Sequence, residues 1–140
     1  MNKKLVIVLL IIFIIILGFL SIVFIKNLQK EEKDYVSELT NIGNDAYSEY
    51  YYKVISIDKN ETEVKAYLKK YENTGLSFDL ESLKGYAINQ DKTEYYELIN
   101  EFLEKNKKCD ENRSMVIIYP NEPYGNTDFT SEIKLNCEVK

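Results

Sequence analysis

DAYSEYYYKV, residues 45–54, places four tyrosines within six positions: Tyr47, Tyr50, Tyr51 and Tyr52. On an α-helix, all of these rings except Tyr52 share one face with Val54, at the spacing i, i+3, i+4, i+7. Rings on one side of a helix usually pack against a neighbouring element, with each hydroxyl reaching a partner or water. The stretch therefore predicts either a packed joint between a helix and the rest of the chain, or an exposed aromatic platform for carbohydrate or a partner protein.

The residues around this stretch continue the helical pattern. Apolar side chains recur mostly every third or fourth position from residue 28 to residue 54, and no proline occurs before residue 120. Gly43 is the one weak point, where we expect the helix to bend or loosen. The pattern predicts an amphipathic stem helix over residues 26–56. The side chains expected to pack the stem onto the rest of the chain are Leu39, Ile42, Ala46, Tyr47, Tyr50, Tyr51 and Val54.

An uncharged segment precedes the stem. Leu5–Ile25 contains 21 residues without a charge, which span about 31 Å as a helix and match the hydrocarbon thickness of a bilayer. A cleaved signal peptide is the rival interpretation, but its apolar run is shorter and ends in a small-x-small site, which is missing after Ile25. We therefore expect an uncleaved transmembrane helix at 5–25, continuous with the stem, and a short tail at 1–4. Tyr47 would lie about 33 Å beyond Ile25, too far out for an aromatic belt at the lipid headgroups.

The orientation of this anchor follows from weaker signals. Lys3 and Lys4 precede the segment, and three lysines follow it by residue 33, so the positive charges are nearly balanced. The tail at 1–4 is very short and both cysteines lie in the long C-terminal part, which favours a cytoplasmic N-terminus. The sequence thus predicts a single-pass protein of the cell membrane, in contact with lipid, with an extracellular head at residues 57–140.

Charge and composition exclude several functions. Residues 26–140 carry 16 of the 18 basic side chains and all 23 acidic ones, a net charge of −7, so the footprint of a nucleic-acid-binding protein is missing. The chain has no histidine and no glycine-rich phosphate loop, and its carboxylates show no distinguishing spacing. We therefore expect a protein that is not an enzyme, with no metal, no cofactor and no evident small-molecule substrate.

The head is expected to combine short helices with a β-hairpin. Asn60-Glu61-Thr62-Glu63 is a capping box that starts a helix ending at Gly75, and residues 91–94 repeat the pattern before a helix at 92–106. Residues 76–86 fit a strand or a short helix equally well. Beyond residue 109 the apolar period changes to two, which predicts strands at 115–119 and 129–137.

The two strands flank a proline- and glycine-containing turn at residues 120–128, in which Tyr124 and Gly125 form a candidate recognition tip. Cys109 lies before the first strand and Cys137 at the end of the second. Antiparallel pairing brings these two positions to the same end of the hairpin, and an isolated pair of cysteines in an extracellular domain is most simply one disulfide. The fold class is α+β: a long transmembrane-plus-stem helix packed on a small head of short helices and a C-terminal antiparallel hairpin.

This order of elements resembles the type IV pilin and pseudopilin family. The segment CDENRSMVIIYPNEPYGNTDFTSEIKLNC, residues 109–137, is similar to the C-terminal part of pilin-like proteins of Gram-positive bacteria, in which two cysteines frame a Pro-Tyr-Gly turn. The resemblance implies that the stem and the disulfide-bounded region make subunit contacts. Residues 5–25 contain no acid where pilins carry a glutamate after the peptidase site, so we expect an unprocessed anchor rather than a major subunit.

Two functions follow from the sequence. The first is a non-enzymatic, membrane-anchored extracellular protein that acts through protein partners or self-assembly, as a minor pilin-like or secretion-system accessory component. The alternative is an anchored binding module for envelope carbohydrate or a partner protein, with exposed tyrosines as its platform. Burial of the rings at 47–51 would favour the first function, and their exposure the second.

Overall fold

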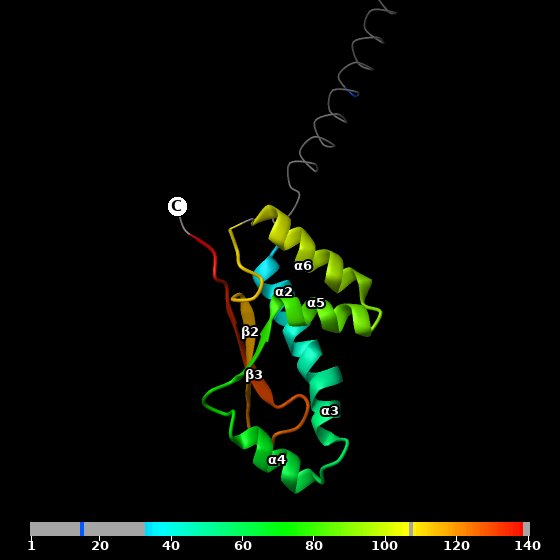
Figure 1. Cartoon of the computed structure of the whole chain (residues 1–140), viewed down its shortest axis with the longest axis vertical. Coiled ribbons are helices and arrows are strands. Elements are labelled where there is room, and N and C mark those ends of the chain that lie inside the picture. The colour runs from blue at the N-terminus through cyan, green and yellow to red at the C-terminus, as the bar shows by residue number, and fades with distance from the viewer. Residues whose placement is uncertain (1–14, 16–32, 107, 139–140) are drawn as a thin grey trace, which may run out of the picture. The chain divides into compact units, whose positions relative to one another are not determined.

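The computed structural model describes residues 15, 33–106 and 108–138, and it is an α+β fold (Figure 1). The predicted transmembrane segment and the start of the stem fall outside these ranges, apart from Ile15. No helix within the described ranges is both long enough and apolar enough to cross a membrane. Residues 35–140 form one compact unit, which therefore includes most of the predicted stem as well as the head.

The outer part of the stem is one uninterrupted helical stretch. It consists of α2 (Tyr35–Asp45), the π-helix η1 (Ala46–Tyr51) and α3 (Tyr52–Ser56). α2 continues through Gly43, where a bend was expected. The glycine instead permits a close approach to strand β2, because a Cβ atom at this position would lie 2.5 Å from Cγ1 of Val116. We refer to residues 35–56 as the core helix.

Three antiparallel strands form a sheet in the order β1-β2-β3: β1 (Leu76–Asp79), β2 (Met115–Pro120) and β3 (Phe129–Lys134). The predicted hairpin is confirmed, with Met115 opposite Lys134 and Pro120 opposite Phe129. Residues 76–86, which fitted a strand or a short helix equally well, contain both a strand and the start of a helix. The first four residues pair with β2 as a strand, and α5 (Leu80–Asn89) follows at once, capped by the Asp79 side chain, which accepts a hydrogen bond from the Ser82 amide.

The first capping box is confirmed. The Asn60 side chain accepts a hydrogen bond from the Glu63 amide at 3.0 Å, and the Glu63 carboxylate accepts one from the Asn60 amide at 2.8 Å. α4 (Glu61–Lys69) nevertheless ends before Gly75, contrary to prediction. Gly75 lies in the turn into β1 with φ +75°, a conformation that favours glycine, and its backbone lies against the Ile117 side chain.

The second predicted capping box is wrong. Asp91 has φ +54° and does not cap, and α6 (Thr93–Lys105) begins after Lys92 without a side-chain cap. The short connection lets α5 and α6 pack side by side (Figure 1). The turn at Asp91 therefore serves the reversal of the chain between two helices rather than the initiation of α6.

The hydrophobic core lies between the core helix, the sheet and the remaining helices. α2 contacts both β2 and β3, and β2, in the centre of the sheet, is almost entirely buried. The fully or almost fully buried side chains come from every layer: Leu39, Ile42, Ala46, Tyr47, Val64, Leu68, Leu80, Leu83, Ile99, Phe102, Val116 and Ile118. The core helix is thus a structural part of the head, because without it one side of the sheet would lose its cover.

Candidate functional site

The tyrosine stretch forms the joint between the core helix and the head, but its buried face differs from the predicted one. Tyr47 is fully buried. The rings of Tyr51 and Tyr52 are half-buried and pack against the core, as does the side chain of Ile55 one turn later. A π-helix has one more residue per turn than an α-helix. The extra residue within Ala46–Tyr51 shifts each later buried position by one, from 50, 51 and 54 to 51, 52 and 55.

Tyr50 and Val54 are therefore wrong as packing residues. Their side chains are 43% and 46% exposed, and Ile57, beyond the end of the helix, is 73% exposed. The Tyr50 ring still contacts the Tyr86 ring, at 6.1 Å between centroids. These three residues recur at i, i+4, i+7 and leave an apolar stripe on the outer side of the core helix, which we call the outer stripe.

The buried rings make specific contacts across the joint. The Tyr47 ring meets Phe129 edge-on at 5.0 Å between centroids, and the Tyr51 ring meets Phe78 at 5.5 Å. The hydroxyls of Tyr51 and Tyr67 are hydrogen-bonded at 2.8 Å, which connects the core helix to α4. The Tyr47 hydroxyl has no hydrogen-bond partner among the described residues, and its burial strongly raises the pKa of this group. Three of the four rings are thus at least half-buried and are not available as a platform.

A polar cluster around Lys92 reinforces the same joint. Its ammonium lies 2.5 Å from a Glu49 carboxylate oxygen, and it lies 5.4 Å and 4.9 Å from the ring centroids of Tyr86 and Tyr95. The Tyr86 hydroxyl donates to Glu49 at 3.2 Å, and the Tyr95 hydroxyl donates to Asp45. The cluster connects the middle of the core helix to α5 and α6.

The charges of this cluster respond to one another. The hydrogen bond from Lys92 lowers the pKa of Glu49. Partial burial lowers the pKa of Lys92, but hydrogen bonding to Glu49 and Tyr86 outweighs it, so the net pKa of Lys92 is raised. The pKa of Tyr95 is raised to about 12, mainly by its hydrogen bond to Asp45 and to a smaller extent by burial. Nothing in the local sequence predicts this cluster, because its two groups, Asp45 with Glu49 and Tyr86 with Lys92 and Tyr95, are at least 37 residues apart.

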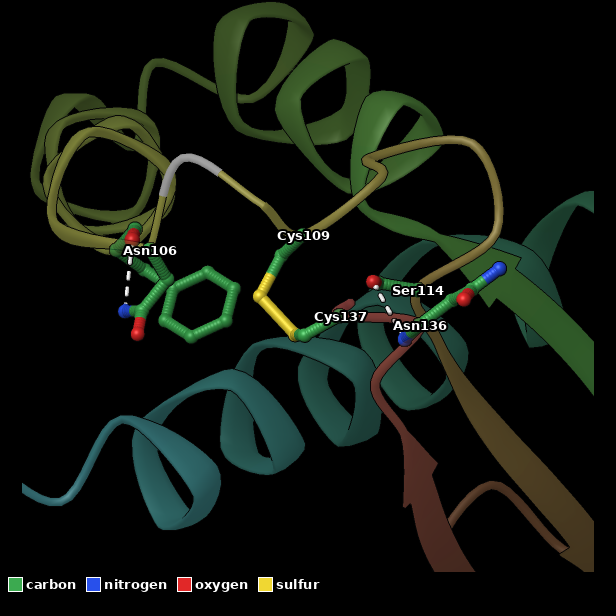
Figure 2. Close-up of a disulfide and its surroundings, with 6 residues drawn as sticks. Asn106, Cys109, Ser114, Asn136 and Cys137 are labelled. Atoms are coloured by element: carbon green, nitrogen blue, oxygen red, sulfur yellow. Dashed lines mark hydrogen bonds between the residues drawn. A yellow bond between two sulfur atoms is a disulfide. The ribbon is translucent and has the colours of Figure 1, made fainter. Parts of the chain in front are cut away.

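The predicted disulfide between Cys109 and Cys137 is present. It joins the segment after α6 to the segment after β3, and Figure 2 shows the bond beside Ser114 and Asn136. The fully buried Ser114 hydroxyl accepts a hydrogen bond from the Asn136 amide at 3.0 Å, and the Asp110 amide donates to the Asn136 carbonyl at 2.9 Å. The bond therefore closes the C-terminal end of the chain onto the end of the sheet at which β2 begins.

Tyr124 and Gly125 were predicted to form an exposed recognition tip, and the prediction is wrong because Tyr124 is buried. Tyr124 is only 5% exposed, and its hydroxyl donates to Glu72 at 2.8 Å. Burial, together with this hydrogen bond, raises the pKa of Tyr124 to about 12. Gly125 donates its amide to the Asp128 carboxylate at 2.8 Å. The turn is thus fixed to the head by its own hydrogen bonds, and the tyrosine holds the turn in place instead of presenting a ring to solvent.

A surface groove of about 420 Å³ lies between α4 and this turn. Its lining residues are Thr62, Lys65, Ala66, Lys69, Glu122, Pro123 and Tyr124. The groove contains no nucleophile with an adjacent base. Within the part of the chain that the structure describes, no three histidine, cysteine or acidic side chains are grouped so that they could hold a metal ion.

Comparison of the chain with protein-family models, with curated proteins and with solved structures found no match.

Proposed function

We propose that this protein is a non-enzymatic, membrane-anchored extracellular protein that acts through protein–protein contacts, as a pilin-like or secretion-system accessory component. The uncharged segment Leu5–Ile25 would root the chain in the membrane, and the core helix would carry the head. The observation that carries the proposal is the burial of the core helix face in the head, in a chain whose uncharged segment ends ten residues before Tyr35.

The outer stripe supports contact with a protein partner. Isolated apolar residues on a surface are ordinary, but Tyr50, Val54 and Ile57 follow one another along one side of a helix. The carbohydrate platform is less well supported, because Tyr47 is buried and Tyr51 and Tyr52 are half-buried. Of the four tyrosines in this stretch, only Tyr50 is exposed, and its ring also contacts that of Tyr86.

Membrane topology can be tested in intact cells of the native host. External protease should remove the head from the full-length chain while leaving a fragment that contains residues 1–25 in the membrane. Mass spectrometry of the mature N-terminus should find residues 1–25 still attached. A soluble chain that begins after residue 25 would contradict the anchoring part of the proposal.

The partner contact can be tested with a photo-crosslinking amino acid at Val54, with Glu97 on the exposed side of α6 as the matched control. We expect a discrete crosslinked species, whether a second copy or another envelope protein, from position 54 and none from position 97. Equal yields from both positions, or no crosslink from 54 in native membranes, would contradict a role of the outer stripe in assembly.

A further inference from the structure

The groove between α4 and the turn after β2 has two chemically different walls. One wall is a single face of α4, because Thr62, Lys65, Ala66 and Lys69 follow the spacing i, i+3, i+4, i+7. The other wall is formed by Glu122, Pro123 and Tyr124. Two lysines thus lie one helical turn apart on one wall, while the opposite wall combines the Glu122 carboxylate with the apolar ring of Pro123 and the side chain of Tyr124.

Both walls are held in place before any ligand binds. On the far side of α4 from the groove, Val64 and Leu68 are buried in the core, and the Asn60 capping box fixes the first turn of the helix. The turn is fixed by the hydrogen bonds of Tyr124 to Glu72 and, through its amide, to the Asn121 carbonyl at 2.6 Å. A site whose walls are already ordered loses little conformational entropy on binding.

The charges of the groove favour an anion on the α4 wall. Lys65 pairs with Glu61 at 2.5 Å, but the Glu61 side chain is 76% exposed and that of Lys65 is 42% exposed, so water screens this pair and it competes weakly with a bound anion. Lys69 has no carboxylate within ion-pair distance among the described residues. Glu122 opposes an anion from the other wall. In a chain of net charge −5, the four α4 residues that line the groove include two lysines and no acid, and the Glu61 partner of Lys65 is not among them.

We propose that this groove binds a phosphate or carboxylate group carried on a small, partly apolar unit, with Lys65 and Lys69 as its cationic contacts. Lysine serves such groups as a point charge with freely rotating donors, and Ala66 and Pro123 offer apolar contact to the carrier. The anion could belong to a free small molecule or to a repeating unit of an anionic polymer. The binding itself does not depend on anchoring or on a protein partner.

The full-length chain in neutral detergent micelles, labelled with ¹⁵N, allows a direct test by NMR titration. Inorganic phosphate tests the anion alone, and an oligomer of glycerol phosphate tests the polymeric source. We expect shifts at the amides of Thr62, Ala66, Lys69 and Tyr124 with both probes, and tighter binding of the oligomer. If only inorganic phosphate binds, the source is a free small anion. Shifts scattered over all exposed lysines, or none at these four amides, would overturn the proposal.

Variants that are expected to change the affinity in opposite directions distinguish a defined binding site from a general attraction of anions to positive charge. Lys69→Gln should weaken binding about threefold, the scale of one exposed charge pair, and Glu122→Gln should strengthen it by a similar factor. Lys70→Gln is the matched control, because it removes the same charge from the neighbouring residue, which does not line the groove. An equal loss with Lys69→Gln and Lys70→Gln would show that binding follows net charge alone. The titration reads only the groove, whereas crosslinking at Val54 tests the outer stripe, so the two proposals can fail independently.

Discussion

Gly43 sets how closely the core helix can approach the sheet. A methyl group at this position would lie within 3 Å of three atoms of the Val116 side chain, which is itself fully buried in the central strand. We expect Gly43→Ala to lower the free energy of unfolding by about 1–3 kcal/mol, the usual cost of overpacking a core. Chemical denaturation of the wild type and the variant, monitored by circular dichroism, measures this difference in the free energy of unfolding.

Gly85 is the matched control, because it also lies in a helix but a Cβ atom there meets nothing within 4 Å. Gly85→Ala should raise the free energy of unfolding by about 0.5–1 kcal/mol through helix propensity. The two substitutions are thus expected to have opposite signs. If Gly43→Ala were as favourable as Gly85→Ala, the close approach of helix and strand described above would be wrong.

Two tyrosines should make the fold sensitive to alkali. The pKa values of Tyr95 and Tyr124 are raised to about 12, whereas tyrosine in an unfolded chain titrates near 10. Between these values the unfolded chain releases protons that the folded chain retains, so the free energy of unfolding should fall as pH rises from about 10 to about 12. Denaturation series across this range, compared with the double variant Tyr95→Phe/Tyr124→Phe, measure the effect. An equally steep fall in the double variant would contradict it.

At the scale of elements, the π-helix explains why the buried positions of the core helix are shifted by one residue after Tyr47. One extra residue within Ala46–Tyr51 should be removable, because its deletion restores α-helical spacing between the buried residues on either side. Deletion of Ser48 should therefore preserve the fold. Deletion of Asn41 in α2 should instead rotate Leu39 out of the core and cost about 2–5 kcal/mol. Thermal unfolding of both variants is the measurement, and a greater loss on deletion of Ser48 would contradict the assignment.

Local sequence patterns predicted most of the elements but not the one-residue shift of the buried positions after η1. The capping box at Asn60 and the alternating strands after residue 115 carry short-range signals, and both elements occur where expected. The extra residue in η1 has no such signal, and the buried ring of η1, Tyr47, packs against Phe129, 82 residues later. The predicted packing residues were therefore correct up to Tyr47 and at Tyr51, and wrong at Tyr50 and Val54.

The functional surfaces were harder to predict than the elements. Tyr124 was expected at an exposed tip because it lies in a turn that contains both prolines and a glycine, but its hydroxyl donates to Glu72, which is 52 residues away in the sequence. The groove was missed for the same reason, since Lys69 and Pro123 meet only in the folded chain. The cysteine pair was predictable because the hairpin itself brings Cys109 and Cys137 together.

At the scale of the whole molecule, the disulfide limits how far the unfolded chain can expand. It closes a segment with a separation of 28 residues, for which the chain-entropy model gives a stabilisation of about 3–4 kcal/mol. Urea denaturation with and without a reductant should show this loss, and the double variant Cys109→Ser/Cys137→Ser should be insensitive to the reductant. A free energy of unfolding that the reductant leaves unchanged would contradict the expected contribution of the bond.

The central claim is that the core helix and the sheet form one cooperative unit, so that the head cannot exist apart from the helix that joins it to the N-terminal segment. Native-state hydrogen exchange of the full-length chain in detergent tests it most directly. We predict that the amides of Leu39 and Ile42 exchange only through global unfolding, with the same opening free energy as those of Val116 and Ile118 in β2. Exchange of the helix amides through a lower-energy opening, while the sheet stays protected, would contradict the account.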